Sequence, residues 1–375
     1  MLFRSDSIPF VKFFITGRPE PRIRSGFRLK SLRPHTEVLK LHGVKAELVD
    51  RDIRLFLKTQ LTDIVENRSH CNYPEDWPSS GDIDILCKKA AGFFIFASTV
   101  VKFIASKHYP PDERLALITS LPQDTSYEGG LGVDLLYAQV LEQAFHTVDE
   151  GFYSHLKSVV GTVILIFNPL SINTLSCLHG NCGSPSRIYN TLRALHSLLL
   201  IPDSMEDPVR IFHKSFPDFL TDPERCKAEK FFINPSVHHQ EILLSCLSLM
   251  KGRLKKNICN LDDHASLDTV EDLPSRSKAQ IGDALGYACQ FWAKHLLEVS
   301  SHGHGVEEVH GAINEFFPTC FLLWIEVLSL MKILDVGVYA LKNIQQWYKL
   351  VSCIHSIHFG KPCSCLFRQK FPASG

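Results

Sequence analysis

Residues 211–220 read IFHKSFPDFL, a stretch that opens with β-branched and aromatic residues and then contains charged residues and a proline. Its start predicts a short strand over 210–213. Upstream, apolar residues recur at helical spacing over 152–167 and 185–200, and Ser171, between them, is a typical helix N-cap. Three helices followed by a small wing make a winged-helix arrangement.

Helical spacing of apolar residues also dominates the chain on both sides of this block. The predicted helices are 50–64, 82–106, 112–120 and 133–145 before it, and 239–254, 277–299, 306–317 and 321–351 after it. Strand composition is found near the start of the chain, at 11–16 and 36–41. We therefore expect a mostly α fold with the remnant of a sheet.

The composition narrows the class of partner. The chain has 375 residues, and its 40 Lys and Arg balance 40 Asp and Glu, so no strong field is available to hold nucleic acid or anionic lipid. Twelve cysteines are too few for a secreted disulfide scaffold, and the apolar stretches 159–167 and 316–325 are too short to span a bilayer. These features predict a cytoplasmic protein without nucleic-acid or membrane partners.

Four blocks of the sequence together resemble the NACHT family of STAND-class P-loop NTPases, in its fungal, NLR-like branch. Residues 13–20, FFITGRPE, look like the family's sensor strand, which ends in Thr-Arg-Pro, and residues 88–97, KKAAGFFIFA, look like the helix that follows. Residues 152–178, with Asn-Pro-Leu-Ser at 168–171, and residues 211–220 are similar to its winged-helix domain. The order and spacing of the blocks agree with the family.

The resemblance implies an order of domains. The chain would begin with the C-terminal remnant of a NACHT nucleotide-binding domain, the edge of a P-loop NTPase α/β sheet. A helical domain, a winged-helix domain, a C-terminal helical region and a divergent tail would follow. The expected bounds of these five parts are 1–66, 82–147, 150–222, 237–351 and 352–375.

The string that would bind phosphates is missing from this chain. A P-loop needs Gly-x-x-x-x-Gly-Lys and then Ser or Thr, so that backbone amides cradle the phosphates and the hydroxyl meets Mg²⁺. No such string occurs, and no strand ending in paired acidic residues comes before Val11. On resemblance the chain is the C-terminal part of a NACHT protein, lacking the P-loop. We expect no catalytic residue, no enzyme activity and no cofactor in this chain alone; the resemblance implies slow NTPases with ADP or ATP and Mg²⁺ among full-length relatives.

Two residues correspond individually to nucleotide contacts of the family. Arg18 matches the sensor arginine that approaches the terminal phosphate, a role that suits the planar, permanently charged guanidinium. His213 matches a histidine that contacts the β-phosphate of ADP and helps to hold the closed state, since an imidazole can donate to a phosphate oxygen. The alternatives are a solvated loop arginine and a histidine packed at a strand end.

Metal and DNA chemistry have weaker support in the sequence. The Cys and His residues of 177–182 and of 355–365 lack the paired Cys-x-x-Cys knuckles of a structural zinc site, and we expect no metal. The third helix of the winged-helix block offers only Arg187 and Arg193 near its start, and two basic residues are few for binding the phosphate backbone of DNA.

The function implied by the resemblance is a truncated NACHT-like signalling switch of the kind used in fungal innate immunity. Such a protein is a nucleotide-dependent regulator in its full-length form and acts through protein partners or self-association. The alternative is a helical protein-interaction module with no nucleotide role. ADP-dependent thermal stabilisation distinguishes the two, because a ligand that binds only the folded state raises its stability.

Overall fold

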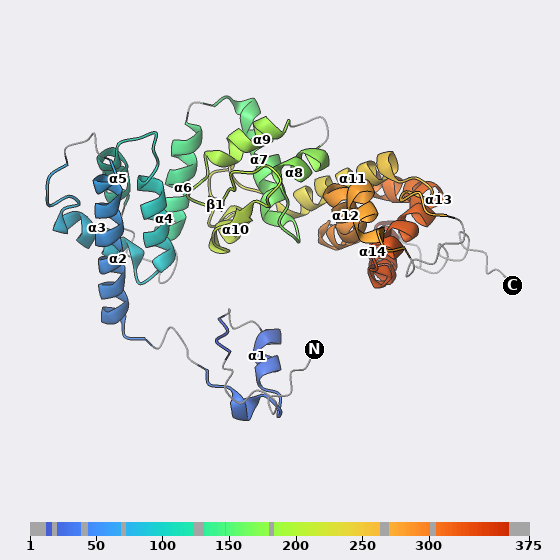
Figure 1. The fold of residues 1–375 in the computed structure, drawn as a ribbon, viewed down its shortest axis with the longest axis horizontal. Coiled ribbons are helices and arrows are strands. Elements are labelled where there is room, and N and C mark those ends of the chain that lie inside the picture. Colours follow the sequence, from blue (N-terminus) through green and yellow to red (C-terminus); the bar gives the residue numbers. More distant parts are fainter. Residues whose placement is uncertain are drawn as a thin grey trace. The chain divides into compact units, whose positions relative to one another are not determined.

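The computed structural model describes residues 13–16, 21–38, 44–68, 73–122, 131–146, 148–179, 184–262, 270–300 and 305–359. The chain divides into two compact units, Met1–Val49 and Asp50–Gly375. The described residues are mostly helical and contain a single pair of short strands (Figure 1). The predicted mostly α fold class is therefore confirmed.

The elements fall into successive groups along the chain. The first unit contains α1 (Pro21–Phe27), the 3₁₀ turn η2 (Arg33–His35) and the start of α2 (Ala46–Glu66). The next group is α3 (Ser80–Ala90), α4 (Phe94–Ile104), α5 (Pro111–Thr119) and α6 (Leu131–Phe145). Then come α7 (Glu150–Leu165), α8 (Ile172–His179), α9 (Pro185–Arg193), β1 (Leu199–Leu200), β2 (Arg210–Ile211) and α10 (Ser215–Leu220). The last group is α11 (Pro235–Arg253), α12 (Leu273–Glu298), α13 (Val306–Leu330) and α14 (Leu334–Phe359).

The two strands expected near the start of the chain are not formed in the residues described there. Residues 13–16 and 36–38 have no strand structure. Phe13 and Phe14 are largely exposed, at 77% and 89% of their surface. A strand needs a hydrogen-bonded neighbour, and none is present in the described part of this unit, so strand composition alone did not produce a sheet edge. Residues 11, 12 and 39–41 lie outside the described ranges.

The long helix expected over 82–106 is two helices, α3 and α4. Ala91 and Gly92 between them have positive φ angles of 46° and 80°, which end the first helix in the left-handed region. Ser79 caps α3: its hydroxyl accepts the Asp82 N–H at 3.1 Å while the Asp82 carboxylate accepts the Ser79 N–H at 3.2 Å. The break lets α4 fold back against α3, and α4 also packs on α5 and α6.

The core of this first helical group is apolar and closely packed. Its buried side chains from α2 include Ile53, Leu57 and Leu61, which recur at helical spacing as the sequence predicted. On α4, Phe96 and Phe103 are among the largest fully buried side chains of the described residues. The aromatic run that follows Gly92 therefore contributes to the core, although Phe93 and Phe94 at its start are 41% and 45% exposed.

Three helices and an antiparallel strand pair follow, and we call the pair β1 and β2 with the segment between them the wing. In the strand pair Leu199 lies opposite Ile211 and Leu200 opposite Arg210, and an isolated bridge joins Ser171 to Pro208. Ser171 caps α8, because its hydroxyl accepts the Thr174 N–H at 3.2 Å. The third helix is shorter than expected. It ends at Arg193, since the chain must turn before Leu199 to pair with β2.

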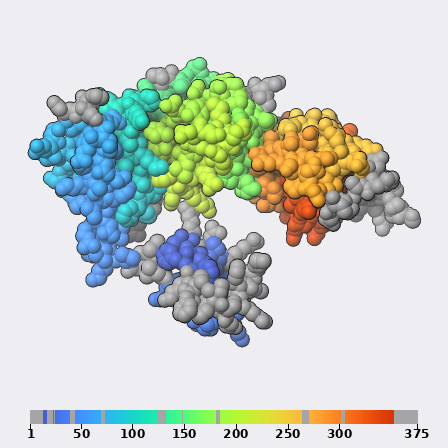
Figure 2. All heavy atoms as spheres, viewed as in Figure 1, coloured from blue at the N-terminus to red at the C-terminus, as the bar shows by residue number. Residues whose placement is uncertain are grey.

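The helices α11 to α14 pack around an aromatic core. The rings of Trp292 and Trp324 are 5.6 Å apart, and Phe316 lies 5.1 Å from Trp292. Trp324 Nε1 donates to Cys289 O at 2.9 Å, which connects α13 to α12. Figure 2 shows the atoms of α11 to α14 together, coloured from yellow through orange to red.

The break between the last two helices is displaced from its expected place. The sequence predicted helices over 306–317 and 321–351, with Pro318 between them, but α13 continues through Pro318 to Leu330. The turn comes at residues 331–333, where Lys332 has a φ of 59°. Burial of Phe316 and Cys320 on either side of the proline outweighs the roughly 3 kcal/mol that proline costs inside a helix.

This continuous α13 is also longer than the apolar stretch recognised in the sequence. Among the described residues it is the one helix that is long and apolar enough to cross a bilayer by length and composition. Its most apolar window has a mean hydropathy of 1.4, and 39% of that window is buried. The buried side chains include Val309, Ile313 and Trp324, and the helix packs on α11, α12 and α14.

Gly161 in α7 marks a close approach of α11. A methyl group at this glycine would lie 2.7 Å from His238 Nε2, and that nitrogen is hydrogen-bonded to Lys157 O at 3.0 Å.

We expect Gly161→Ala to destabilise the protein by about 1–3 kcal/mol, although alanine is the better helix former, because the hydrogen bond holds the His238 ring in place. Urea unfolding measures the change. The matched control is Gly311→Ala in α13, where an added methyl meets nothing within 4 Å and is expected to stabilise by up to about 1 kcal/mol. Equal effects of the two substitutions would contradict the close approach.

Candidate functional site at the wing and beside α12

His213 is an exposed residue two positions after the end of β2. Its Nδ1 accepts the Ser215 backbone N–H at 3.1 Å and lies 2.7 Å from the Ser215 hydroxyl. Because Nδ1 accepts, Nε2 carries the proton of the neutral ring and is its hydrogen-bond donor. The second predicted site residue, Arg18, lies outside the described residues.

We call His213 and Ser215, with the contacts between them, the His213 corner. Ser215 connects this corner to α6. Its hydroxyl is 2.7 Å from the hydroxyl of Tyr137, which is 1% exposed. The Tyr137 ring packs on Phe216 and Phe219 at ring distances of 5.4 and 5.7 Å. Burial raises the pKa of Tyr137, so its hydroxyl stays protonated and can donate. The wing and α10 are therefore tied to α6 by both a polar and an aromatic contact.

Two ion pairs extend this contact along α6. Arg225 Nε and Nη2 donate to the two carboxylate oxygens of Asp134 at 2.9 and 2.6 Å, a bidentate arrangement. The Asp134 side chain is 10% exposed and that of Arg225 31%, so this pair is partly shielded from water. Lys230 Nζ donates to Glu142 at 2.7 Å in a more exposed position. We call the contacts of Asp134, Tyr137 and Glu142 with the segment 215–230 the α6 seam.

A cation from α4 also reaches the wing. Lys102 Nζ lies 3.6 Å from the centre of the Phe212 ring, the residue before His213. Burial lowers the pKa of Lys102. The segment 212–215 is thus bordered by two helices of the first helical group, α4 and α6.

The residues of α6 that form the seam share one face of the helix in the sequence itself. Asp134, Tyr137 and Glu142 stand at positions i, i+3 and i+8, which fall on one face of a helix. Two of the three are charged, so the face resembles an ordinary solvated helix surface. Only the tertiary structure brings Arg225 and Lys230 opposite it.

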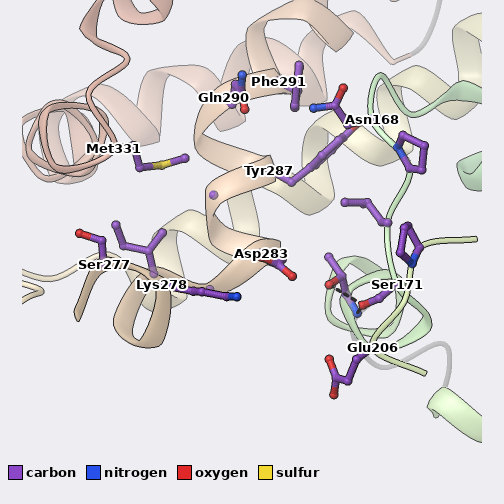
Figure 3. Close-up of a pocket in the computed structure, with 17 residues that line it drawn as sticks. Asn168, Ser171, Glu206, Ser277, Lys278, Asp283, Tyr287, Gln290, Phe291 and Met331 are labelled. Atoms are coloured by element: carbon purple, nitrogen blue, oxygen red, sulfur yellow. Dashed lines mark hydrogen bonds between the residues drawn. The ribbon is translucent and has the colours of Figure 1, made fainter. Parts of the chain in front are cut away.

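A cavity of about 470 Å³ lies between α12 and the segments around the wing. Its walls include Asn168, Ser171 and Glu206 on one side and Lys278, Asp283 and Tyr287 on the other. Figure 3 shows Tyr287 extending from α12 toward Asn168, with Met331 on the opposite wall. Both signs of charge occur in the lining, so the cavity has no evident preference for an anion or a cation.

The helix that lines this cavity is interrupted at Gly282. Its backbone there has φ 66° and ψ 171°, a conformation that an L-residue with a side chain rarely adopts. The interruption separates Lys278 from Asp283 and turns the following part of α12 toward Asn168. Glycine is therefore required at the point where α12 bends around the cavity.

A chain of buried hydrogen bonds starts beside the same cavity. Tyr287 Oη accepts the Phe167 N–H at 3.3 Å and lies 2.8 Å from His295 Nε2. His295 Nδ1 lies 2.7 Å from His239 Nδ1. Two protonated rings would oppose one N–H to another at that distance, so the contact requires a neutral ring on at least one side. Burial is the main cause that lowers the pKa of His239 to about 4 and that of His295 to about 3.

These buried hydrogen bonds join three elements that are distant in sequence. Phe167 follows α7, His239 is on α11, and Tyr287 and His295 are on α12. The Phe167 ring also lies 4.7 Å from the His295 ring. Sequence reasoning assigned His239 only to a helix start and did not single out His295 or Tyr287, since nothing local relates them.

The arrangement is that of a helical protein with a small two-stranded wing whose polar contacts run to a neighbouring helix. No protein-family model matches the chain, and no solved structure matches it significantly. The chain is similar to the vegetative incompatibility protein HET-E-1 of Podospora anserina, with 23% identity over 355 residues. That similarity covers 89% of this chain and 24% of the relative, so the chain spans about a quarter of the relative's length.

The Asp134–Arg225 pair is expected to contribute more to stability than the Glu142–Lys230 pair. Asp134→Asn should lower the free energy of unfolding by about 1–3 kcal/mol, because it leaves a partly buried guanidinium without its carboxylate. Glu142→Gln, in the exposed pair, should cost less than about 1 kcal/mol. Urea unfolding of both variants tests this, and a larger loss for Glu142→Gln would contradict the expected order.

The two buried histidines should make the folded protein less stable as the pH decreases. Since their folded pKa values are below the ordinary 6.5, the unfolded state binds protons that the folded state does not. The contribution of the neutral rings to the free energy of unfolding is fully present above about pH 6.5. It declines as the pH falls to about 4, by up to about 1.4 kcal/mol per pH unit for each ring. Urea unfolding at a series of pH values should show a smaller decline for His239→Gln than for the unchanged protein. His146→Gln, at an exposed position on the end of α6, is the control; an unchanged decline in His239→Gln would refute the assignment.

Proposed function

We propose that this chain is part of a nucleotide-controlled signalling switch of the NACHT type. The similarity to a vegetative incompatibility protein over 89% of the chain supports a general signalling role. The observation that carries the finer proposal is the position of His213, which is exposed two residues after the strand β2, with Nδ1 accepting the Ser215 N–H. A donor at this place suits a phosphate oxygen of ADP.

In this proposal the α6 seam holds the closed state. The wing and α10 contact α6 through Tyr137 and Ser215, and Asp134 binds Arg225. A phosphate on His213 would act two residues from Ser215, the residue that joins the wing to Tyr137. Binding at His213 and closure of the seam would therefore favour each other, as linkage between a ligand and a conformation requires.

The chain's own residues would bind and report a nucleotide rather than hydrolyse it. The P-loop string does not occur in the sequence, and Arg18, the second phosphate contact implied by the resemblance, remains a proposal. A partner protein or a second copy of the chain would receive the signal, and the neutral composition is consistent with action in the cytoplasm. Nucleic acid and membrane are not proposed as partners.

A second candidate function has one specific observation in its favour. Apolar side chains on α13 and α14 are exposed: Leu322 at 78%, Val338 at 55% and Tyr339 at 63%. Exposed apolar groups on neighbouring helices are typical of protein-interaction surfaces. In this alternative the helices bind a partner and the His213 corner has no ligand.

Thermal unfolding with ADP and Mg²⁺ separates the two functions. We expect millimolar ADP to raise the Tm, by about 2–4 °C for each kcal/mol of added stability, because ADP would bind only the folded state. His213→Ala should abolish the rise without a large change in the Tm of the free protein, since the residue is exposed.

His146→Ala is the matched control, because His146 is also exposed and its Nδ1 contacts only its own helix, at Gln143 O. It should retain the full response to ADP. An equal response in His213→Ala and His146→Ala would exclude His213 as the contact. No response of the unchanged protein to millimolar ADP would favour the interaction module.

A further inference from the structure

A second cavity of about 280 Å³ lies where the α4–α5 turn, α6 and the end of α9 meet. It shares no lining residue with the cavity of Figure 3 and does not include His213. Its size is near the lower end of ligand pockets, roughly 300 Å³, and well above the roughly 30 Å³ of one water. The lining residues are Phe103, Ser106, His108, Tyr109, Arg114, Val140, Gln143, Ala144, Asn190, Arg193, Ala194, His196 and Ser197.

Arg114 is a buried cation in the wall of this cavity, with 6% of its surface exposed. Nη1 donates to Phe103 O at 2.9 Å, whereas Nε has no hydrogen-bond partner. The guanidinium lies 4.0 and 4.3 Å from the ring centres of Phe103 and Tyr109, and no carboxylate pairs with it among the described residues. A buried charge without a counter-charge destabilises the folded protein, so a bound anion would stabilise this arginine.

Two further polar atoms of the same wall are buried without a partner. Ser197 is 1% exposed, and its hydroxyl forms no hydrogen bond in the protein. His196 Nε2, in the preceding residue, also has none. Buried polar groups are almost always hydrogen-bonded, and here three residues of one cavity wall, on α5 and in the turn after α9, each carry a buried polar atom without a partner.

The charges of the lining have one sign. Arg114 and Arg193 are cationic, His108 and His196 can become so, and none of the thirteen lining residues is acidic. Gln143 and Asn190 add amide groups that can donate. Among the described residues the cavity therefore offers many donors and no carboxylate that would repel an anion.

We infer that this cavity binds the phosphate group of a small phosphorylated molecule. Arg114 would present its Nε and Nη2 edge to two phosphate oxygens, the geometry in which a guanidinium pairs with phosphate. The Ser197 hydroxyl would donate to a third oxygen, and Arg193 at the rim would add charge. Phosphate suits the site because it has several acceptor oxygens for these separate donors.

The inference is independent of the proposed ADP contact at His213. The bound phosphate would connect α5 with the turn after α9, and so would join the first helical group to the elements of the wing. It would also supply partners for polar atoms whose burial is otherwise unfavourable. A ligand at this place would therefore stabilise the folded protein.

Thermal unfolding with inorganic phosphate tests the inference directly. We expect the Tm to rise with phosphate concentration and to saturate, while sodium chloride at equal ionic strength gives no saturating rise. Ser197→Ala should weaken phosphate binding about tenfold, the effect of one lost hydrogen bond. Without phosphate this variant should be at least as stable as the unchanged protein, because the deleted hydroxyl has no partner.

Arg114→Lys keeps the charge but loses the planar fork, and should weaken binding by at least as much. Arg253→Gln, at an exposed arginine that lines neither cavity, should leave the response unchanged. The inference is refuted if phosphate gives no saturating rise, or if Ser197→Ala and Arg114→Lys respond as the unchanged protein does. An equal rise with succinate would overturn the assignment to phosphate in favour of a carboxylate.

Discussion

The contact between α6 and the segment that follows the wing is the interaction on which the rest of the arrangement depends. The Tyr137 hydroxyl, 2.7 Å from Ser215, is buried beneath Phe216 and Phe219, so it cannot exchange this partner for water. Asp134 and Arg225 form a bidentate pair on the same face of the helix. The position of His213, two residues from Ser215, follows from this anchorage.

Polar groups in this protein gather where groups of helices meet. The chain of Phe167, Tyr287, His295 and His239 satisfies its members with one another, and burial keeps both rings neutral. The cavity beside Arg114 is different, because its buried donors exceed the acceptors that the protein supplies. The first arrangement is complete within the protein, whereas the second is completed by an anion.

The similarity to a vegetative incompatibility protein covers about a quarter of that relative, so the activity of a whole protein of that kind is a proposal for this chain. In the proposed switch, the α6 seam holds the closed state in addition to stabilising the fold. Besides the packing of the Tyr137 ring, the seam is held by one hydroxyl contact and two ion pairs, and it can open at a moderate cost because these polar groups bind water once they are exposed. A fully apolar interface of the same extent would be harder to reverse.

Periodicity in the sequence determined most of the helices, since an amphipathic helix requires apolar residues at a spacing that can be read locally. The buried positions of α2 were predicted in this way, whereas the short strand at Arg210–Ile211 was predicted from its β-branched and aromatic residues. Only the tertiary structure decided that 13–16 forms no strand, that Ala91 and Gly92 divide a helix, and that Pro318 does not. It also brought Arg114 together with His196 and Ser197, and Asp134 with Arg225. These outcomes depend on partners distant in sequence, and a local pattern contains no information about which distant residue will supply the missing hydrogen bond or charge.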